Sequence, residues 1–229
     1  MDENKIPLHI GLIMDGNGRW AKKRLMPRSY GHNAGMNAMI KIAEHAKERG
    51  VKYLTVYTLS TENLLRPQEE LEGLYGLFRK YFTKNVQKLY NSGAGVKVIG
   101  DISVLPEDVQ ALLIGGENNS PKDCAFWLIF AINYGARSEI LRAVNLAIER
   151  GEKLDANKFE NLLYTHGVPD PDLIIRTGGE KRLSNFLLYQ LAYSELYFTD
   201  TLFPDFGAAE LDKAIEEFSK RERRFGKIK

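Results

Sequence analysis

Short apolar runs alternate with longer amphipathic stretches along the whole chain. Six of the apolar runs are candidate strands: Ile10–Met14, Tyr53–Leu59, Val96–Gly100, Phe126–Ile132, Leu173–Ile175 and Leu196–Phe198. Strands that are apolar at nearly every position are typical of a parallel sheet that is covered on both faces. The pattern therefore predicts a six-stranded, mostly parallel sheet.

The amphipathic stretches predict the helices that flank this sheet. They span about 31–49, 68–90, 106–117, 136–150, 156–165 and 208–225. In the last of them, Leu211, Ile215 and Phe218 fall on one helical face at a period of 3.6 residues. Alternating strands and helices imply a right-handed, three-layer α/β fold, in which the sheet lies between two layers of helices. The chain has no repeat and no Pro/Ser-rich linker, so we expect residues 1–229 to form a single domain.

Polar segments that contain glycine or arginine follow four of the predicted strands. They are residues 15–19, 60–66, 133–137 and 176–185. In open parallel α/β sheets, ligands bind at the carboxyl ends of the strands. We therefore expect these four segments to meet at one edge of the sheet and to form the functional site.

The composition narrows the class of protein. The chain has 229 residues, of which 44% are hydrophobic and 27% charged, and its net charge of +2 is too small to indicate a nucleic-acid partner. The N-terminus lacks the apolar region of a signal peptide, and no apolar run approaches the roughly 20 residues of a membrane span. We expect a cytoplasmic protein, and the composition allows peripheral contact with a membrane.

Asp15 is the first candidate for chemistry. It follows the first predicted strand and shares a turn with Gly16, Gly18 and Arg19. Glycine lets a backbone approach a ligand closely, and Mg²⁺ is commonly held by one or two carboxylates together with substrate phosphates. The turn therefore indicates a site for a metal-bound ligand that carries phosphate.

Basic residues gather after the fifth predicted strand. Arg176, Lys181 and Arg182 lie around a Gly-Gly turn, and guanidinium groups bind phosphate oxygens in a bidentate manner. Arg28 and His32, near the start of a predicted helix, are further candidates for anion binding. Together these groups could hold a diphosphate; the alternative for each segment is a solvated surface loop.

The segment after the second predicted strand and the residue before the last one each have two possible roles. The segment Ser60–Asn63, with Arg66 after it, is either an N-capping turn or part of the site. Glu195, before the last apolar run, is either a second metal ligand or an ion-pair partner, and spacing alone does not distinguish these roles. Signatures of P-loop, dinucleotide-binding and zinc-protease sites do not occur in the sequence.

Five blocks of the sequence resemble those of the cis-prenyltransferases, in the order of that family. They are Asp15–Trp20, Ser60–Asn63, Asn133–Gly135, Arg176–Glu180 and Arg221–Gly226. Within the family, the chain looks most like the bacterial undecaprenyl diphosphate synthases, from about His9 to Gly226. The resemblance implies a Mg²⁺-dependent homodimer with an apolar tunnel. Such enzymes extend farnesyl diphosphate with isopentenyl diphosphate to a long-chain product, such as undecaprenyl diphosphate for the lipid carrier of peptidoglycan and cell-wall synthesis.

The same resemblance implies roles for single residues. Asp15 would hold Mg²⁺ on the allylic diphosphate, Glu195 would be a second metal ligand, and Asn63 takes the position of the proton acceptor. The other residues on the allylic side would be Gly16, Asn17, Gly18, Arg19, Trp20, Arg28 and His32, with Ser60, Thr61, Glu62, Leu64 and Arg66 beside Asn63. Isopentenyl diphosphate would be bound by Arg176, Arg182, Leu183 and Ser184.

The sequence departs from the family pattern at two positions. Leu64 replaces a tryptophan that many bacterial members carry, and Lys181 replaces a common histidine.

Two alternative functions stay open. A Mg²⁺-dependent phosphohydrolase of the haloacid-dehalogenase kind needs a second aspartate where this chain has Asn17. A non-catalytic family member that binds prenyl lipids would lose the metal-binding aspartate or the arginines, which this chain keeps. No Asp-Asp-x-x-Asp cluster occurs, which argues against a trans-type prenyl synthase.

Overall fold

A single six-stranded sheet forms the centre of the molecule. The computed structural model describes residues 6–221, and every pair of neighbouring strands in the sheet is parallel, in the order β3-β4-β2-β1-β5-β6. The strands are β1 His9–Ile13, β2 Tyr53–Ser60, β3 Ala94–Ile99, β4 Phe126–Tyr134, β5 Leu173–Arg176 and β6 Glu195–Phe198. The predicted α/β fold with a parallel sheet is confirmed, and each strand lies within a few residues of its prediction.

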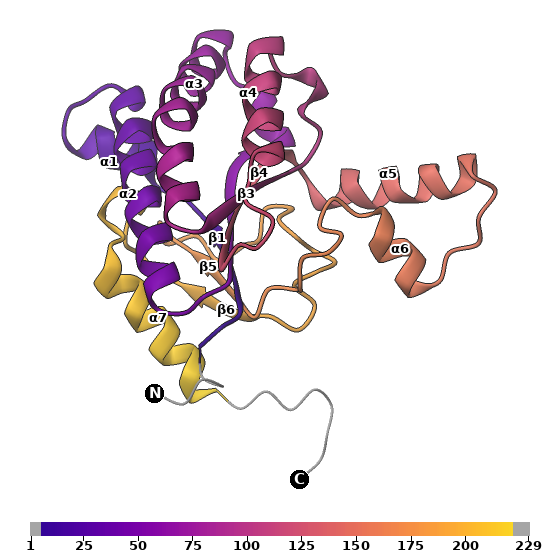
Figure 1. Ribbon diagram of the computed structural model, residues 1–229. Helices are drawn as coiled ribbons and strands as arrows, with labels where there is room; N and C mark the ends of the chain where they lie inside the picture. Colours follow the sequence, from indigo (N-terminus) through magenta and orange to yellow (C-terminus); the bar gives the residue numbers. More distant parts are fainter. Residues whose placement is uncertain (1–5, 222–229) are drawn as a thin grey trace.

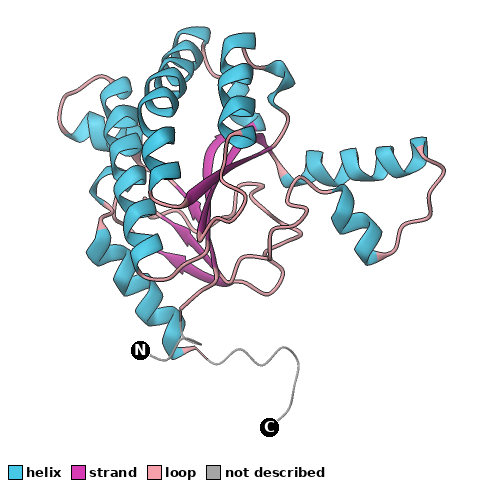
Figure 2. Ribbon diagram, in the orientation of Figure 1, coloured by secondary structure: helices cyan, strands magenta, loops and turns pink. Residues whose placement is uncertain are grey.

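Helices pack mainly against one face of this sheet. They are α1 Asn17–Lys23, α2 Arg28–Glu48, α3 Gln68–Asn91, α4 Glu107–Asn118, α5 Ala136–Glu149, α6 Ala156–Leu162 and α7 Ala208–Lys220. Short 3₁₀ turns are η2 Thr61–Leu65, η3 Ile102–Val104 and η4 Phe203–Asp205. Figures 1 and 2 show α2, α3 and α4 side by side over the sheet, with α5 and α6 projecting from the body. Within residues 6–221, every helix is too short or too polar to cross a membrane.

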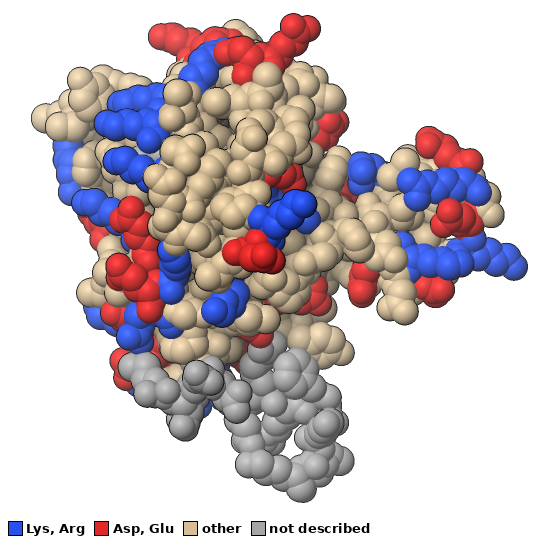
Figure 3. Space-filling model, in the orientation of Figure 1, with Lys and Arg blue, Asp and Glu red and all other residues tan. Residues whose placement is uncertain are grey.

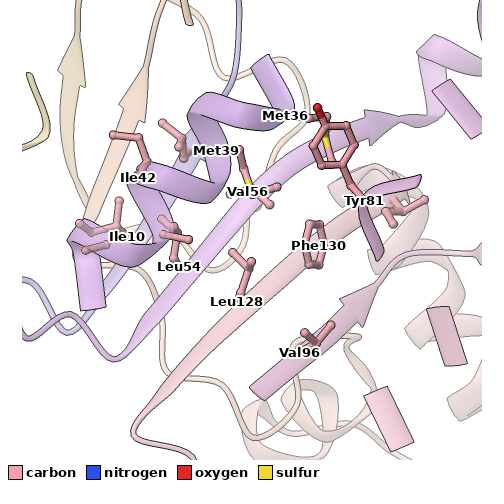
Figure 4. Packing of buried hydrophobic residues seen from close by; sticks show 14 of the residues in the cluster. Ile10, Met36, Met39, Ile42, Leu54, Val56, Tyr81, Val96, Leu128 and Phe130 are labelled. Atoms are coloured by element: carbon pink, nitrogen blue, oxygen red, sulfur yellow. The ribbon is translucent and has the colours of Figure 1, made fainter. Parts of the chain in front are cut away.

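The two faces of the sheet are covered in different ways. On the helical face, alternate strand residues such as Leu54, Val56 and Leu128 pack with Met36 and Met39 of α2 in the main core (Figure 4). On the other face, strand residues pack against the irregular segment 183–191, whose Phe186 and Leu187 are fully buried. An irregular loop therefore covers this face of the sheet, where a second layer of helices was expected.

Three helix predictions need correction. Helix α1 was not predicted, because its Asn-Gly-Arg start favours a turn; Gly16 in the left-handed conformation starts it, and α1 packs closely on α2. The predicted helix 156–165 ends at Leu162, beyond which the chain turns. The predicted helix 208–225 ends at Lys220, and residues 222–225 lie outside the described part of the chain.

His9, at the start of β1, ties the amino end of the sheet together. Its side chain is buried; Nδ1 lies 2.6 Å from the Pro169 carbonyl oxygen and Nε2 lies 2.8 Å from Thr55 Oγ1. Burial lowers the pKa of His9 to about 4, although the Pro169 carbonyl and the Asp172 carboxylate act to raise it. The imidazole is therefore neutral in the folded protein at neutral pH.

This shift predicts an acid-sensitive fold. The pKa of His9 is lower in the folded chain than the ordinary value of 6.5, so its stabilising contribution is complete above pH 6.5 and is lost as the pH falls from 6.5 towards 4. We expect the free energy of unfolding to fall by about 2–3 kcal/mol over that range because of His9 alone. Urea unfolding at both pH values, in wild type and His9→Gln, measures this share. The matched control is His166→Gln at an exposed histidine, which should keep the full pH dependence; equal pH dependence in His9→Gln and wild type would contradict the assignment.

Candidate functional site

The site forms where β1 lies between β2 and β5. The chain passes from β1 to β2 on one side and later returns to β5 on the other, which makes the carboxyl end of β1 a topological switch point. Asp15 follows β1 directly, and Arg176 is the last residue of β5, in register with Ile13. The sheet therefore brings together two residues that lie 161 positions apart in the sequence.

Asp15 and Arg176 form the ion pair at the centre of the site. Arg176 Nη2 donates to Asp15 Oδ2 at 2.9 Å, and Arg19 Nη2 lies 3.2 Å from Asp15 Oδ1. The Arg176 side chain is only 4% exposed, whereas that of Asp15 is 29% exposed. Arg176 Nη1 also donates to Ser184 Oγ at 2.8 Å and to the Arg182 carbonyl oxygen. One guanidinium group thus links the turn after β1 to the loop after β5.

Two glycines allow these loops to approach each other. Gly16 has φ 112°, and a Cβ there would lie 2.9 Å from Leu202 Cδ2. Gly178 has φ 84°, and its Cβ would lie 2.6 Å from Arg19 Nη2 and 3.0 Å from the Asp15 carbonyl oxygen. Only glycine fits both positions, because each has a left-handed backbone and leaves no room for a Cβ atom.

Glu70 of α3 gathers three basic groups beside Asp15. Its Oε1 lies 2.9 Å from Arg66 Nη1, 3.3 Å from Arg28 Nε and 3.6 Å from His32 Nε2. Burial lowers the pKa of His32, and the charges of Arg66 and Arg28 lower it further, against the raising effect of Glu70. A bound anion would raise that pKa, because it favours the charged imidazole. Glu70 was not predicted as a site residue, and the positive charge of Arg28 and Arg66 is the only feature of the sequence that points to it.

Eight of the predicted allylic residues line one open pocket of about 660 Å³, and Trp20 is not among them. Its walls include Asp15, Gly16, Asn17, Gly18, Arg19, Arg28, His32 and Arg66. A smaller cavity of about 40 Å³ shares Met14, Asn17 and His32 with this pocket. An apolar cavity of about 100 Å³ between α2, α3 and β4 shares Met36 with the small one. Together the three spaces form a row that runs from the charged pocket into the core.

A second pocket of about 280 Å³ lies on the other side of the ion pair. Its lining includes Glu62, Arg137, Leu183, Ser184 and Asn185. Burial acts to raise the pKa of Glu62, but hydrogen bonds from its own backbone and from the side chains of Ser60, Asn185 and Thr61 lower it below its usual value. Glu62 is therefore ionised at neutral pH, and it faces the loop that carries Ser184.

Asn185 holds three of the four loops together. Its carbonyl oxygen accepts from Ala136 N–H at 2.8 Å, its Oδ1 accepts from Arg137 N–H at 2.9 Å, and its Nδ2 donates to Glu62 Oε1 at 3.1 Å. Asn185 thus caps the start of α5 from a distant loop and fixes Ser184 against Glu62. Sequence reasoning missed this residue, although asparagine suits its left-handed φ of 65°.

We expect Asn185 to act as a positioning residue. Asn185→Gly keeps the left-handed backbone and removes both side-chain bonds. For the substrates that the resemblance implies, it should raise the KM for isopentenyl diphosphate, expected beside Ser184, about tenfold, while the KM for the allylic substrate, expected beside Asp15, changes less than about threefold. Asn185→Asp, which keeps only the acceptor and faces Glu62 with a like charge, should show a similar split. Asn119→Gly, at an exposed asparagine after α4, is the control. Equal changes in both KM values would indicate a general structural role instead.

The segment after β2 is a capped turn that also reaches the site. Asn63 Oδ1 accepts from Ser60 N–H at 3.2 Å, and the two residues form a reciprocal capping box. The capping reading of this segment is therefore confirmed, and the role of Asn63 as proton acceptor stays a prediction. Leu64 packs against the main core, and Thr61 lies beside Gly135.

The side chains of three predicted site residues have partners outside the central ion pair. Trp20 Nε1 donates to Asp205 Oδ1 at 2.6 Å, which fixes α1 against η4. Arg182 is mostly exposed and pairs with Glu180. Glu195 begins β6 in register with Leu173, at the amino end of the sheet, and its Oε2 lies 2.6 Å from Arg221 Nη1. Within one chain, Glu195 and Asp15 lie at opposite edges of the sheet, so the described residues do not bring the two predicted metal ligands together.

Comparisons with known proteins show which family the chain resembles. Residues 13–226 match the family model described as "Putative undecaprenyl diphosphate synthase". An isoprenyl transferase of Fusobacterium nucleatum is 49% identical over 99% of both chains. Lavandulyl diphosphate synthase from Lavandula x intermedia, solved in complex with dimethylallyl diphosphate, superimposes with a TM-score of 0.94 at 36% identity, covering 98% of this chain and all of that one.

A second similar solved structure is that of a bacterial protein. A probable undecaprenyl diphosphate synthase from Campylobacter jejuni superimposes with a TM-score of 0.83 at 33% identity, covering 99% of this chain and all of that one. Both solved structures superimpose on nearly the whole chain, and the family match spans the loops that build the charged pocket. The chain belongs to the undecaprenyl diphosphate synthase family of prenyltransferases.

Proposed function

We propose that the protein condenses isopentenyl diphosphate with an allylic diphosphate, farnesyl diphosphate, to form a long-chain cis-polyprenyl diphosphate. Undecaprenyl diphosphate for the cell-wall lipid carrier is the product we propose, and the cytoplasm is the proposed place of the reaction. The relatives named above support the reaction class. The observation that carries the proposal is the Asp15–Arg176 ion pair, because it joins two anion-binding loops at one sheet edge.

Two diphosphate subsites on either side of this ion pair suit a condensation. The pocket with Arg19, Arg28 and Arg66 would hold the allylic diphosphate, and the loop with Arg182 and Ser184 would hold isopentenyl diphosphate. Arg176 contacts both sides, so it fixes how far apart the two substrates lie. Holding two reactants in a fixed geometry is itself a large part of catalysis.

The donor set at Asp15 fits a magnesium ion that is shared with a diphosphate. Asp15 is partly exposed at the edge of an open pocket, and the described residues contain no cluster of three His, Cys, Asp or Glu side chains that could hold an ion alone. Mg²⁺ typically takes one or two carboxylates together with substrate phosphates. When bound at Asp15, the ion would supply charge neutralisation for the diphosphate.

The chain's own cations supply the rest of the electrostatic stabilisation. Ionisation of the allylic C–O bond places extra negative charge on the leaving diphosphate, and preorganised cations stabilise that charge. Arg28 and Arg66 are already held in place by Glu70 before substrate binds. His32 lies with them, and burial and these two arginines lower its pKa. A diphosphate bound beside it would favour the charged imidazole.

The proton released on C–C bond formation needs an acceptor within hydrogen-bond reach. Asn63 is the acceptor that the resemblance implies. Its amide oxygen already accepts from Ser60 N–H, and an amide is a weak base. A diphosphate oxygen is the second candidate. It is the more favourable acceptor, because the amide oxygen of Asn63 is already engaged with Ser60 N–H.

The growing chain would occupy the row of cavities that leads from the pocket into the core. Leu74, Leu77 and Phe78 line the middle cavity, and Tyr81 and Phe82 line the innermost one. Figure 4 shows Tyr81, Leu128 and Phe130 in this part of the core. An apolar path that starts at the diphosphate pocket supports a tunnel for a prenyl chain.

A homodimer is part of the proposal. Leu141 and Ile148 of α5 are 64% and 70% exposed, on a helix that projects from the body (Figure 1). Leu141 and Ile148 are seven residues apart and so lie on the same face of the helix, and apolar surface that is exposed on one face is a candidate protein interface. A second copy packed on α5 would cover them.

The test is incubation of the full chain with farnesyl diphosphate, labelled isopentenyl diphosphate and Mg²⁺. Transfer places the label in extractable lipid and releases inorganic diphosphate. A phosphohydrolase would release phosphate without labelled lipid. Asn17, which packs closely against Gly35, stands where that chemistry needs a second aspartate, so the structure disfavours this alternative. A non-catalytic lipid-binding protein would do neither.

A further inference from the structure

The stretch between Asp15 and Glu44 has an unusual charge balance. It contains six lysine and arginine residues and no aspartate or glutamate, in a chain whose net charge is only +2. Arg24 and Arg28 pair with Asp205 and Glu70 from elsewhere in the fold, and Arg19 pairs with Asp15 at the start of the stretch. Lys22 and Lys23, in the last turn of α1, are exposed, and the described residues offer them no ion-pair partner.

Apolar side chains follow these lysines directly and point into solvent. Leu25 is 97% exposed, Met26 is 45% exposed and Tyr30 is 59% exposed. Leu25 also has a φ of 56°, a conformation that is unfavourable for leucine. Nothing within the described part of the chain packs over this loop, which projects at the left of Figure 1, and Figure 3 shows an uncharged tip there with Lys and Arg side chains beside it.

The combination of an exposed apolar tip and unpaired cations matches the surface of an anionic membrane. Apolar side chains enter the boundary between head groups and acyl chains, and neighbouring lysines bind anionic lipid head groups. Lys22, Leu25 and Met26 also form part of the rim of the charged pocket. The loop therefore lies where the pocket opens.

We propose that residues 22–30 dock the protein on anionic phospholipid bilayers, with Leu25 and Met26 inserted and Lys22 and Lys23 on the lipid head groups. The proposal rests on the surface chemistry of this loop and not on the proposed condensation. Vesicle binding without substrate can therefore fail while condensation succeeds, and the reverse.

The experiment is co-sedimentation of the full chain with phosphatidylcholine vesicles that contain about one-third phosphatidylglycerol. We expect binding at about 0.1 M salt and at least tenfold weaker binding to pure phosphatidylcholine or at high salt, where charges are screened. The double variant Lys22→Glu/Lys23→Glu should bind at least about 25-fold more weakly, since each cation near such a surface contributes about fivefold. Leu25→Ser/Met26→Ser should bind at least about tenfold more weakly, because it removes the inserted apolar area.

Matched controls change the same residue types elsewhere. Val104→Ser removes an apolar side chain that is 55% exposed on η3, and Lys153→Glu reverses a charge after α5. Both should bind like wild type, and all variants should unfold within about 2 °C of it. Absence of wild-type binding to the anionic vesicles would overturn the proposal. Wild-type affinity in both loop variants, or equal losses in the controls, would overturn it as well.

Discussion

Asp15→Ala should abolish condensation while the chain still folds. We expect kcat/KM to fall at least about a thousandfold, which corresponds to about 4 kcal/mol of transition-state stabilisation. The variant removes the one carboxylate suited to hold Mg²⁺ in the charged pocket, and it leaves Arg176 buried without its acidic partner. Product formation from farnesyl and isopentenyl diphosphates is the measurement.

A second variant separates the loss of the metal-binding charge from the loss of the partner of Arg176. Removing one partner of a buried ion pair is destabilising, so part of the loss in Asp15→Ala could come from a displaced Arg176. Asp15→Asn keeps oxygen and size and loses only the charge, and it should be nearly as inactive as the alanine variant. Asp101→Asn, at the same sheet edge after β3, is the control and should stay within about threefold of wild type. Near-normal product formation by Asp15→Asn would contradict the role of Asp15.

Arg176→Ala should act mainly on isopentenyl diphosphate. The guanidinium group holds Ser184 Oγ, the Arg182 carbonyl and Asp15 at the same time. Without it, the loop of the second subsite loses its attachment to the ion pair. We expect the KM for isopentenyl diphosphate to rise at least about tenfold, with a smaller change in the KM for the allylic substrate.

Arg176→Lys sharpens this prediction. An ammonium group cannot reproduce the planar fork that spans two loops, so the lysine variant should show the same pattern of KM values as the alanine variant. Arg150→Ala, at an exposed arginine after α5, controls for a general loss of charge. An effect confined to the allylic substrate would reverse the assignment of the two subsites.

The sheet was predictable because its strands carry their own signal. Buried parallel strands such as β4 are apolar along nearly their whole length, and the polar loops that follow β1, β2 and β5 marked the edge where the site forms. Helix α1 was missed because it begins with Asn17 and Gly18, two residues of poor helix propensity. Its helical state depends on packing against α2, where Gly31 and Gly35 admit Asn17 at distances that a Cβ would block.

The residues that organise the site were harder to predict than those that line it. Asp15 and Arg176 stand next to apolar strands, where an ionised side chain is conspicuous in the sequence. Glu70 and Asn185 act through partners that only the tertiary structure brings close, and neither has a distinctive local sequence. The position of Glu195, at the opposite edge from Asp15, follows from the register of β6, which sequence spacing does not encode.

In the proposed mechanism, the Asp15–Arg176 ion pair separates and aligns two diphosphate subsites. The decisive experiment is a crystal structure of the full chain with Mg²⁺, an unreactive thio analogue of farnesyl diphosphate and isopentenyl diphosphate. We expect one diphosphate beside Arg19, Arg28 and His32, and the other beside Ser184 and Arg182, with Arg176 between them. A single diphosphate that occupies both sets of residues, or an isopentenyl diphosphate bound away from Arg176, would contradict it.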